Sequence, residues 1–251
     1  MTESHSLNVA SVIPKLAVIG GRLEDDNVAI YDEMRRLAGG RIVVFATASS
    51  VPDEVGAETV EVFRAHGFDA VLAGVHGAGA GQAAQDTAIA DLVADYGSVY
   101  FTGGDQALIT GALAPGGTES RVLKAIRQMQ RNGALVAGSS AGAAIMSDVM
   151  ISGGTSLEAA TYGVVDDPDQ PGMLLEPGLG FFAWGMVDQH FIKRGRLGRL
   201  IVGMQASGAK RGFGIDENTA LFVEGKRAQV IGEYGVFVLD LEEANVDRSL
   251  G

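Results

Sequence analysis

The sequence predicts an α/β fold with three layers, in which helices cover both faces of a doubly wound, mostly parallel sheet. Short runs rich in aliphatic and β-branched residues are apolar throughout, as in parallel strands buried on both faces. They lie at 15–20, 41–47, 68–75, 98–103 and 134–138. Helical patterns separate these runs, at 26–37, 53–66, 82–96 and 119–131. Alternation of strands and helices is typical of a doubly wound sheet.

The C-terminal part of the chain has a different pattern. After Gly212, strand-like segments follow one another through short turns (TALFVEG, RAQVIG and GVFVLDLE), which predicts an antiparallel extension. We find no internal repeat and no linker rich in proline or serine. We therefore expect a single domain over 1–251, with 1–13 as a flexible tail.

Composition excludes several classes of function. The chain has no cysteine, so it has neither a disulfide framework nor a cysteine nucleophile. A formal charge of −12 disfavours nucleic acid as a partner. No apolar stretch is long enough for a membrane span, and the N-terminus lacks a signal-peptide pattern. We expect a cytoplasmic protein without a membrane partner, and a homodimer is possible.

The strongest local signal is the segment Gly138-Ser139-Ser140-Ala141-Gly142. It follows a buried apolar run and precedes a helical pattern, which is the context of a nucleophile elbow. The central residue, Ser140, is therefore the candidate nucleophile. A turn of small residues, or a phosphate-binding loop, is the alternative interpretation.

A serine nucleophile needs a base, and the chain has 4 histidines. His5 and His66 lie in the tail and near a helix end. His190 ends an apolar segment, where a strand would deliver it to the carboxyl edge of a sheet, and His76 lies in a glycine-rich loop. We predict His190 as the base, with His76 as the second candidate.

Two carboxylates are candidates for the residue that orients His190. Glu158 lies in GGTSLEAA, and Glu217 lies in GFGIDENTALFV. Either residue could instead be an ordinary surface carboxylate, and the sequence does not choose between them.

The segment TGGDQ at 102–106 follows the fourth apolar run. Its glycines let a backbone N–H approach a reacting carbonyl, so Gly104 and the amide of Ala141 are the candidate oxyanion donors. Gln106 could bind a substrate amide. Taken alone, this segment could equally be a turn with a helix cap.

Polar residues surround His190. Asp188 and Gln189 precede it, and Arg194, Arg196 and Arg199 follow it. Arginines beside a base can hold a substrate carboxylate in a fork geometry. A solvated basic helix start is the alternative.

Together these segments resemble the cyanophycinases, serine peptidases that are related to aspartyl dipeptidases and distantly to class I glutamine amidotransferases. The matching segments appear in the family's order: LAVIGG at 16–21, FTGGDQ at 101–106, GSSAGAAIMSD at 138–148, DQHFIKRGRLGRL at 188–200 and GIDENTALFVEG at 214–225. One departure is Ser139, where the family pattern has threonine. The stretch from 155 to 180 matches less clearly, which puts Glu158 in doubt.

The resemblance implies an exopeptidase that cuts cyanophycin, a polyaspartate with arginine joined to each β-carboxyl, into β-aspartyl-arginine dipeptides through an acyl-enzyme on Ser140. In that setting Asp188 would pair with a substrate guanidinium, and one of the three arginines would hold the free carboxylate. An aspartyl dipeptidase acting on short peptides and a binding protein without turnover are the alternatives. We expect no cofactor and no metal, because no histidine–carboxylate cluster has ligand spacing.

Overall fold

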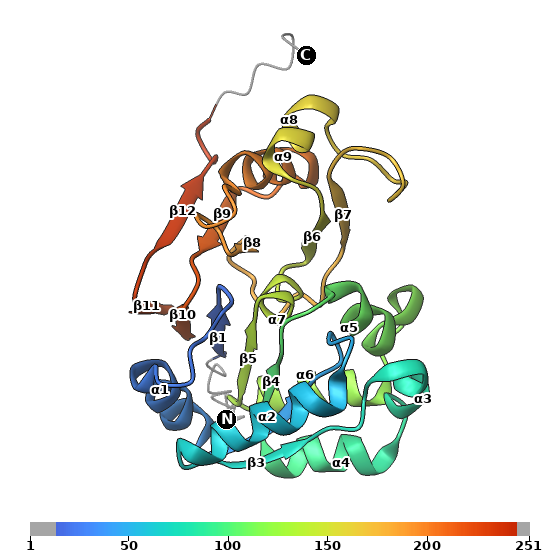
Figure 1. Ribbon diagram of the computed structural model, residues 1–251, viewed down its shortest axis with the longest axis vertical. Coiled ribbons are helices and arrows are strands. Elements are labelled where there is room, and N and C mark those ends of the chain that lie inside the picture. The colour runs from blue at the N-terminus through green and yellow to red at the C-terminus, as the bar shows by residue number, and fades with distance from the viewer. Residues whose placement is uncertain (1–13, 245–251) are drawn as a thin grey trace, which may run out of the picture.

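The computed structural model of this protein describes residues 14–244 and has a seven-stranded sheet at its centre (Figure 1). The strand order is β11-β10-β1-β5-β4-β2-β3. Five of these strands are parallel: β1 (Lys15–Ile19), β2 (Arg41–Phe45), β3 (Asp69–Leu72), β4 (Ser98–Phe101) and β5 (Leu135–Ser139). Antiparallel strands β10 (Thr219–Glu224) and β11 (Arg227–Gly232) extend the sheet beyond β1.

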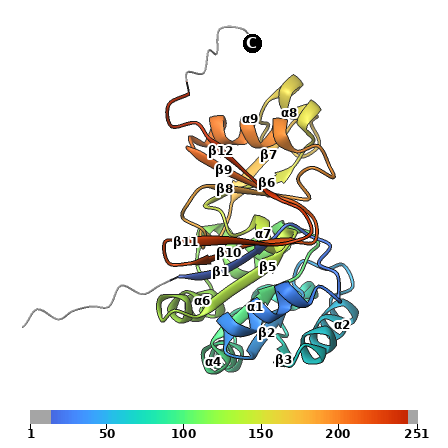
Figure 2. The same ribbon diagram turned by 90° about the vertical axis from the view of Figure 1, so that its left-hand side faces the viewer.

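Helices cover both faces of this sheet, which confirms the predicted three-layer fold (Figure 2). On one face lie α1 (Val28–Ala38) and α2 (Pro52–Ala65), whose buried side chains pack against alternate residues of the strands. On the other face lie α4 (Thr87–Tyr96), α5 (Gln106–Leu113) and α6 (Arg121–Arg131). The strands separate the two apolar cores because their successive side chains point to opposite faces.

One predicted helix differs from the structure. The pattern at 82–96 is not continuous: a short α3 (Ala80–Ala83), preceded by the 3₁₀ turn η1 (Gly77–Gly79), ends before α4 begins. The side chain of Asp86 accepts a hydrogen bond from the backbone N–H of Ala88 at 2.7 Å and caps the new helix. A second 3₁₀ turn, η2 (Pro115–Gly117), follows α5.

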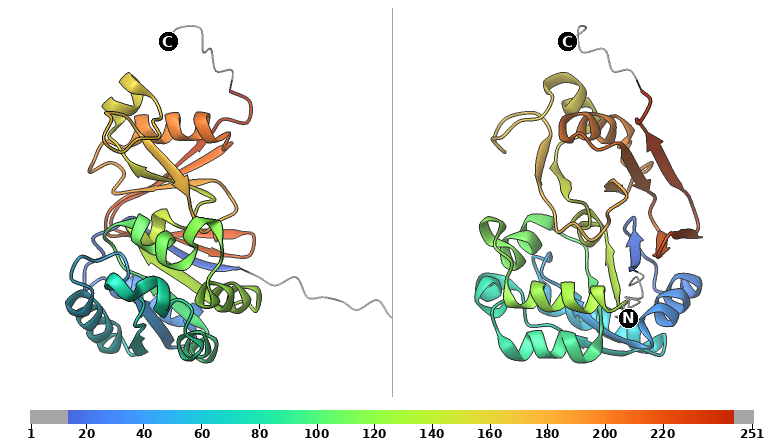
Figure 3. Two further views of the ribbon diagram at one scale, coloured as in Figure 1. Left: turned by 90° about the vertical axis from the view of Figure 1, so that its right-hand side faces the viewer. Right: turned by 180° about the vertical axis from the view of Figure 1, so that it is seen from behind.

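A smaller group of elements lies beyond the carboxyl ends of the parallel strands (Figure 3). It contains a three-stranded sheet of β8 (Met186–Gln189), β9 (Arg211–Ile215) and β12 (Val236–Asp240), and the pair β6 (Val149–Gly153) and β7 (Leu174–Pro177). Helices α8 (Ser156–Tyr162) and α9 (Leu197–Ser207) complete it. Met186, Phe191, Leu200 and Met204 are buried in its own apolar core.

The predicted antiparallel extension is confirmed, with one difference. Strands β10 and β11 join the central sheet, but β12 pairs with β9 in the smaller sheet. Within 14–244 no helix has the length and apolar character to cross a bilayer. The predicted flexible tail, 1–13, lies outside the described residues, and the single domain over 1–251 stays a prediction.

Candidate active site

Ser140 stands at the sharp turn between β5 and the short helix α7 (Ala141–Ala144). Its backbone has φ 55° and ψ −110°, a region that a residue with a side chain rarely occupies. The flanking glycines make this turn possible, because a Cβ on Gly138 would lie 2.3 Å from the carbonyl oxygen of Gly142. The strand–turn–helix context predicted for this segment is therefore present.

His190 lies directly after β8, with its imidazole against Ser140. Its Nε2 is 2.8 Å from the Ser140 hydroxyl oxygen, and its backbone N–H donates to the carbonyl of Gly20 at 2.7 Å. A Cβ on Gly21 would lie 2.2 Å from Cε1 of the ring. The loop after β1 thus fixes the plane of His190, and only glycine fits there.

Glu217 completes a chain of hydrogen bonds. Its Oε1 is 2.7 Å from Nδ1 of His190, so with the proton on Nδ1 the imidazole donates to Glu217 and accepts from Ser140 through Nε2. Glu217 lies between β9 and β10, at the carboxyl edge of the central sheet. The guanidinium Nε of Arg22 is 4.0 Å from its second oxygen.

The other candidate carboxylate, Glu158, lies elsewhere and the structure contradicts its assignment. Its Oε2 accepts a hydrogen bond from the backbone N–H of Thr155 at 2.8 Å, and the Thr155 hydroxyl accepts one from the N–H of Glu158. This is a capping box at the start of α8. The same hydrogen bonds lower the pKa of Glu158. Its negative charge stabilises a helix and does not orient His190.

The second candidate base is also placed away from Ser140. His76 has its Nε2 at 3.5 Å from Oδ1 of Asp53 at the start of α2. His66 stacks on Tyr31 with ring centroids 4.0 Å apart. Neither residue has a hydrogen bond to Ser140, so among the histidines within 14–244 only His190 has the geometry of a base.

The environment of His190 favours its neutral form. Burial lowers its pKa below the ordinary value near 6.5, and the hydrogen bond to Glu217 opposes that shift. The positive charges of Arg194 and Arg196 lower the pKa further. A neutral imidazole at physiological pH is the form that can accept the proton of Ser140.

The two backbone N–H groups predicted as oxyanion donors have no acceptor within residues 14–244. In the described part of the chain no acceptor takes the N–H of Ala141, the first residue of α7, or the N–H of Gly104. Gly104 has φ 137°, and a Cβ there would lie 2.1 Å from the carbonyl oxygen of Ala48. A Cβ on Gly103, which the sequence interpretation did not single out, would lie 3.2 Å from that of Ser140.

Asp188 and Arg199 form a buried ion pair, and this corrects their predicted roles. The side chains are 1% and 6% exposed, and the guanidinium Nε and Nη2 donate to the two carboxylate oxygens at 2.7 and 2.5 Å. Arg199 also donates to the carbonyl of Gly154. Asp188 is thus occupied by a protein guanidinium, and Arg199 is not free to bind a substrate carboxylate.

The remaining polar candidates are nearer the surface. Arg196 donates through Nη1 to the backbone and side-chain oxygens of the buried Gln189, both at 2.7 Å, and burial lowers its pKa to about 10. Gln106 donates its amide to the carbonyls of Ile151 and Ser152 at 3.0 and 3.2 Å, which leaves its oxygen for other partners. Arg194 is exposed and has no ion pair with any residue of 14–244.

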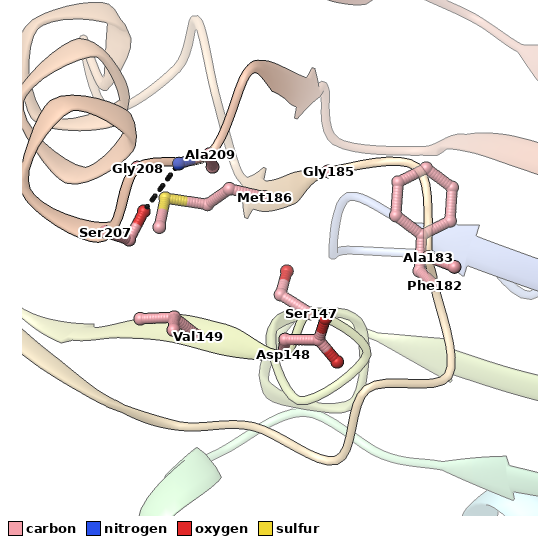
Figure 4. A pocket seen from close by; sticks show the side chains of 10 residues that line it. All are labelled: Ser147, Asp148, Val149, Phe182, Ala183, Gly185, Met186, Ser207, Gly208 and Ala209. Carbon is pink, nitrogen blue, oxygen red and sulfur yellow. Dashed lines mark hydrogen bonds between the residues drawn. The ribbon is translucent and has the colours of Figure 1, made fainter.

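A separate pocket lies among the smaller group of elements (Figure 4). It has a volume of about 220 Å³ and lies between Ser147, Phe182, Met186 and the end of α9. Figure 4 shows a largely apolar lining, and none of the candidate site residues belongs to it. This pocket is therefore separate from the hydrogen-bonded chain of Ser140, His190 and Glu217.

Comparison with known proteins identifies the family of this chain. The model of peptidase family S51 matches residues 16–231. The chain belongs to peptidase family S51. S51 membership makes the protein a peptidase, and a serine-type hydrolase is consistent with that family.

Several S51 relatives carry the name cyanophycinase. The cyanophycinases of Trichormus variabilis and Nostoc sp. are both 34% identical over 235 residues, covering 90% of this chain and 73% of theirs. That of Geminocystis herdmanii is 32% identical over 232 residues, 89% of this chain and 79% of its own. The family resemblance predicted from the sequence motifs is confirmed.

Solved structures agree with the fold. A peptidase from an acI-B1 actinobacterium superposes with a TM-score of 0.70 at 18% identity, covering 92% of both chains. A protein described as a putative peptidase E from Listeria monocytogenes has a TM-score of 0.58 at 17% identity, covering 88% of this S51 chain and 100% of its own. At these identities the likeness concerns the fold alone.

Proposed function

We propose that this S51 peptidase is an exopeptidase that hydrolyses cyanophycin to β-aspartyl-arginine dipeptides, with Ser140 as nucleophile, His190 as base and Glu217 as the orienting acid. The observation that carries the proposal is the chain of hydrogen bonds through Ser140, His190 and Glu217, at 2.8 and 2.7 Å. The cyanophycinase relatives support the substrate.

In the first half of the reaction the Ser140 oxygen attacks the carbonyl carbon of a backbone amide. Its proton passes to Nε2 of His190, and the carboxylate of Glu217 stabilises the resulting imidazolium. The amides of Ala141 and Gly104 donate to the oxyanion of the tetrahedral intermediate. When the intermediate collapses, the C–N bond breaks, the proton goes from His190 to the leaving amine, and an ester remains on Ser140.

In the second half a water molecule replaces the leaving amine. His190 takes a proton from the water as it attacks the ester carbonyl, and the Ser140–carbon bond breaks with return of that proton to the serine. The acid product then dissociates. Each group begins and ends the cycle in its original protonation state.

Recognition of the substrate differs from the sequence prediction, because Asp188 and Arg199 neutralise each other. We assign the carboxylate of the substrate arginine to Arg194, with Arg196 beside it. The backbone N–H of Arg194 donates to the carbonyl of His190 at 3.0 Å, which supports a place for Arg194 beside the proposed base. The free oxygen of Gln106 is the proposed acceptor for a substrate amide.

Incubation of purified protein with cyanophycin, followed by mass analysis of the soluble products, tests the proposal. We expect β-aspartyl-arginine as the product, and we expect a serine-directed fluorophosphonate to label Ser140. Release of free arginine alone, or cleavage of short aspartyl dipeptides with no action on the polymer, would contradict the assignment. Absence of labelling would indicate a binding protein without turnover.

A further inference from the structure

A second cavity, of about 550 Å³, lies between α1, α2 and the loop that follows β1. Its volume is within the range of small-molecule sites. Leu23 and Asp25 line it from the loop, Tyr31 from α1, and Glu58 from α2, with Tyr100 of β4 at its base. None of these residues belongs to the hydrogen-bonded chain of Ser140. We call this cavity the acidic pocket.

Two buried tyrosines face the acidic pocket. Tyr31 is 4% exposed and Tyr100 is 6% exposed, and both line the cavity. The hydroxyl of Tyr31 has no hydrogen-bond partner in 14–244, and part of its surface remains accessible. Burial raises the pKa of both phenols, that of Tyr100 to about 12, so they stay neutral. A neutral phenol oxygen inside a cavity can accept a hydrogen bond from a donor group of a bound ligand.

The charge of the acidic pocket is negative. Glu61 is paired with Arg64 at 2.8 Å, whereas Asp25 and Glu58 have no ion pair with any residue of 14–244. His66 approaches Asp25 only at its backbone carbonyl, at 2.7 Å from Nε2. Over the same described residues, no group of carboxylates and histidines converges as a metal site would require. Spread carboxylates with a phenol oxygen between them fit an extended organic cation that has several donors.

The acidic pocket is joined to the candidate active site in two ways. The loop after β1 packs Gly21 against the His190 ring and then places Asp25 in the pocket wall. The Tyr100 side chain lies against Ser139, the residue before the nucleophile. A substrate chain held at Ser140 therefore has a charged cavity beside it on the side of α1 and α2.

We propose that the acidic pocket binds the guanidinium of an arginyl side chain of the substrate, on a unit other than the one being cleaved. The planar group has five N–H donors, which suits the carboxylates of Asp25 and Glu58 and the oxygen of Tyr31. This inference rests on the proposed function for the identity of the polymer. The chemistry of the ligand, a guanidinium, is inferred from the lining of the acidic pocket and does not depend on the proposed function.

The first test measures binding without turnover. Agmatine, a guanidinium compound that lacks a carboxylate, is titrated into Ser140→Ala protein by calorimetry, with Glu58→Gln, Asp25→Asn or Glu54→Gln added. We expect the first two to weaken binding about tenfold each, the scale of one charged hydrogen bond. Glu54→Gln removes an exposed charge from the same helix outside the pocket, and it should change nothing. Equal binding in all variants, or equal weakening by Glu54→Gln, would overturn the inference.

The second test compares substrates of different length in the protein with Ser140 intact. Glu58→Gln should raise KM for long cyanophycin about tenfold with kcat unchanged, and leave KM for a substrate of two units unchanged. If the parent cuts cyanophycin and Glu58→Gln leaves both KM values unchanged, the inference is wrong and the proposed function stands. If agmatine binds through the pocket and the parent cuts no cyanophycin, the proposed function is wrong and the ligand class stands.

Discussion

Gly21 and His190 are packed so closely that a single methyl group does not fit between them. A Cβ on Gly21 would lie 2.2 Å from Cε1 and 2.4 Å from Nε2 of the imidazole, and the glycine has φ 108°. The ring is hydrogen-bonded to Ser140 and to Glu217, and the loop after β1 packs against it as well. Glycine at 21 thus sets the position of His190, the proposed base.

The first prediction follows from this contact. Gly21→Ala should displace His190 from Ser140 and lower kcat at least a hundredfold, because misplacement by about 1 Å has costs on that scale. Gly39→Ala is the control, since Gly39 also has a positive φ, 66°, but no atom within 4 Å of a built Cβ. It should lose only about 1 kcal/mol of stability. Similar kcat values in the two folded variants would refute the positioning role.

The second prediction concerns the strained turn. Ser140→Ala and Ser140→Gly should each reduce activity about 10⁴-fold, as expected on loss of a triad member. Their stabilities should differ, because φ 55° with ψ −110° is costly for alanine and accessible to glycine. Denaturant unfolding should show Ser140→Gly more stable by about 1–3 kcal/mol. Ser139→Ala should retain most of the activity. A larger loss of activity in Ser139→Ala than in Ser140→Ala would show that Ser140 is not the nucleophile.

The third prediction is a pH profile. Because burial lowers the pKa of His190, kcat/KM should rise with pH through a group below the ordinary value near 6.5. Arg194 also lowers this pKa, so at low ionic strength Arg194→Ala should move the rising limb of the pH profile to higher pH.

Arg194→Ala should also lower kcat/KM about 10- to 200-fold, because it removes the proposed contact with the substrate carboxylate. Arg194→Lys should restore part of this loss. Arg227→Ala, an exposed charge on β11, should leave both quantities unchanged.

The lowered pKa of His190 has a consequence for stability with a definite sign. The unfolded chain binds a proton near pH 6.5, and the folded chain binds it only at lower pH. This residue's contribution to the free energy of unfolding is therefore complete above pH 6.5 and declines as pH falls toward the folded pKa. In His190→Ala that part of the pH dependence should disappear from denaturant titrations.

The fourth prediction separates structural from binding arginines. Arg199→Ala should lower the free energy of unfolding by about 3 kcal/mol, because it removes the hydrogen-bonded partner of the buried Asp188 carboxylate and leaves only the guanidinium of Arg196, at 3.6 Å. Replacing both residues with apolar ones, Asp188→Leu with Arg199→Met, should recover much of that loss. Chemical denaturation of the parent and the two variants measures these free energies of unfolding. An Arg199→Ala protein of parental stability with raised KM would return this residue to substrate binding.

Local patterns in the sequence predicted much of the fold and part of the site. Continuous apolar runs predicted the parallel strands, and the elbow context predicted Ser140, because both depend on neighbours along the chain. The structure adds what depends on distant segments. Glu158 and Glu217 were equivalent candidates, although Thr155 three residues before Glu158 already forms a capping-box pattern that would have favoured a structural role.

No pattern in the sequence indicated two features of the site. Asp188 and Arg199 are eleven residues apart in the sequence. They pair because the chain turns after β8 and α9 begins at Leu197. The role of Gly21 depends on a contact with a histidine far along the chain. A glycine after a strand is ordinary, so only the packed structure distinguishes this one.

The short connection from β9 to β10 carries the chain from the smaller sheet into the central one, and Glu217 is in its middle. His190 also comes from the smaller sheet, while Ser140 belongs to the central one. A partly folded chain with only the central sheet in place would carry Ser140 and, just before β10, Glu217, but not His190, which comes from the smaller sheet. The proposed proton path from Ser140 to Glu217 would therefore be complete only after the two sheets had docked and brought His190 between them.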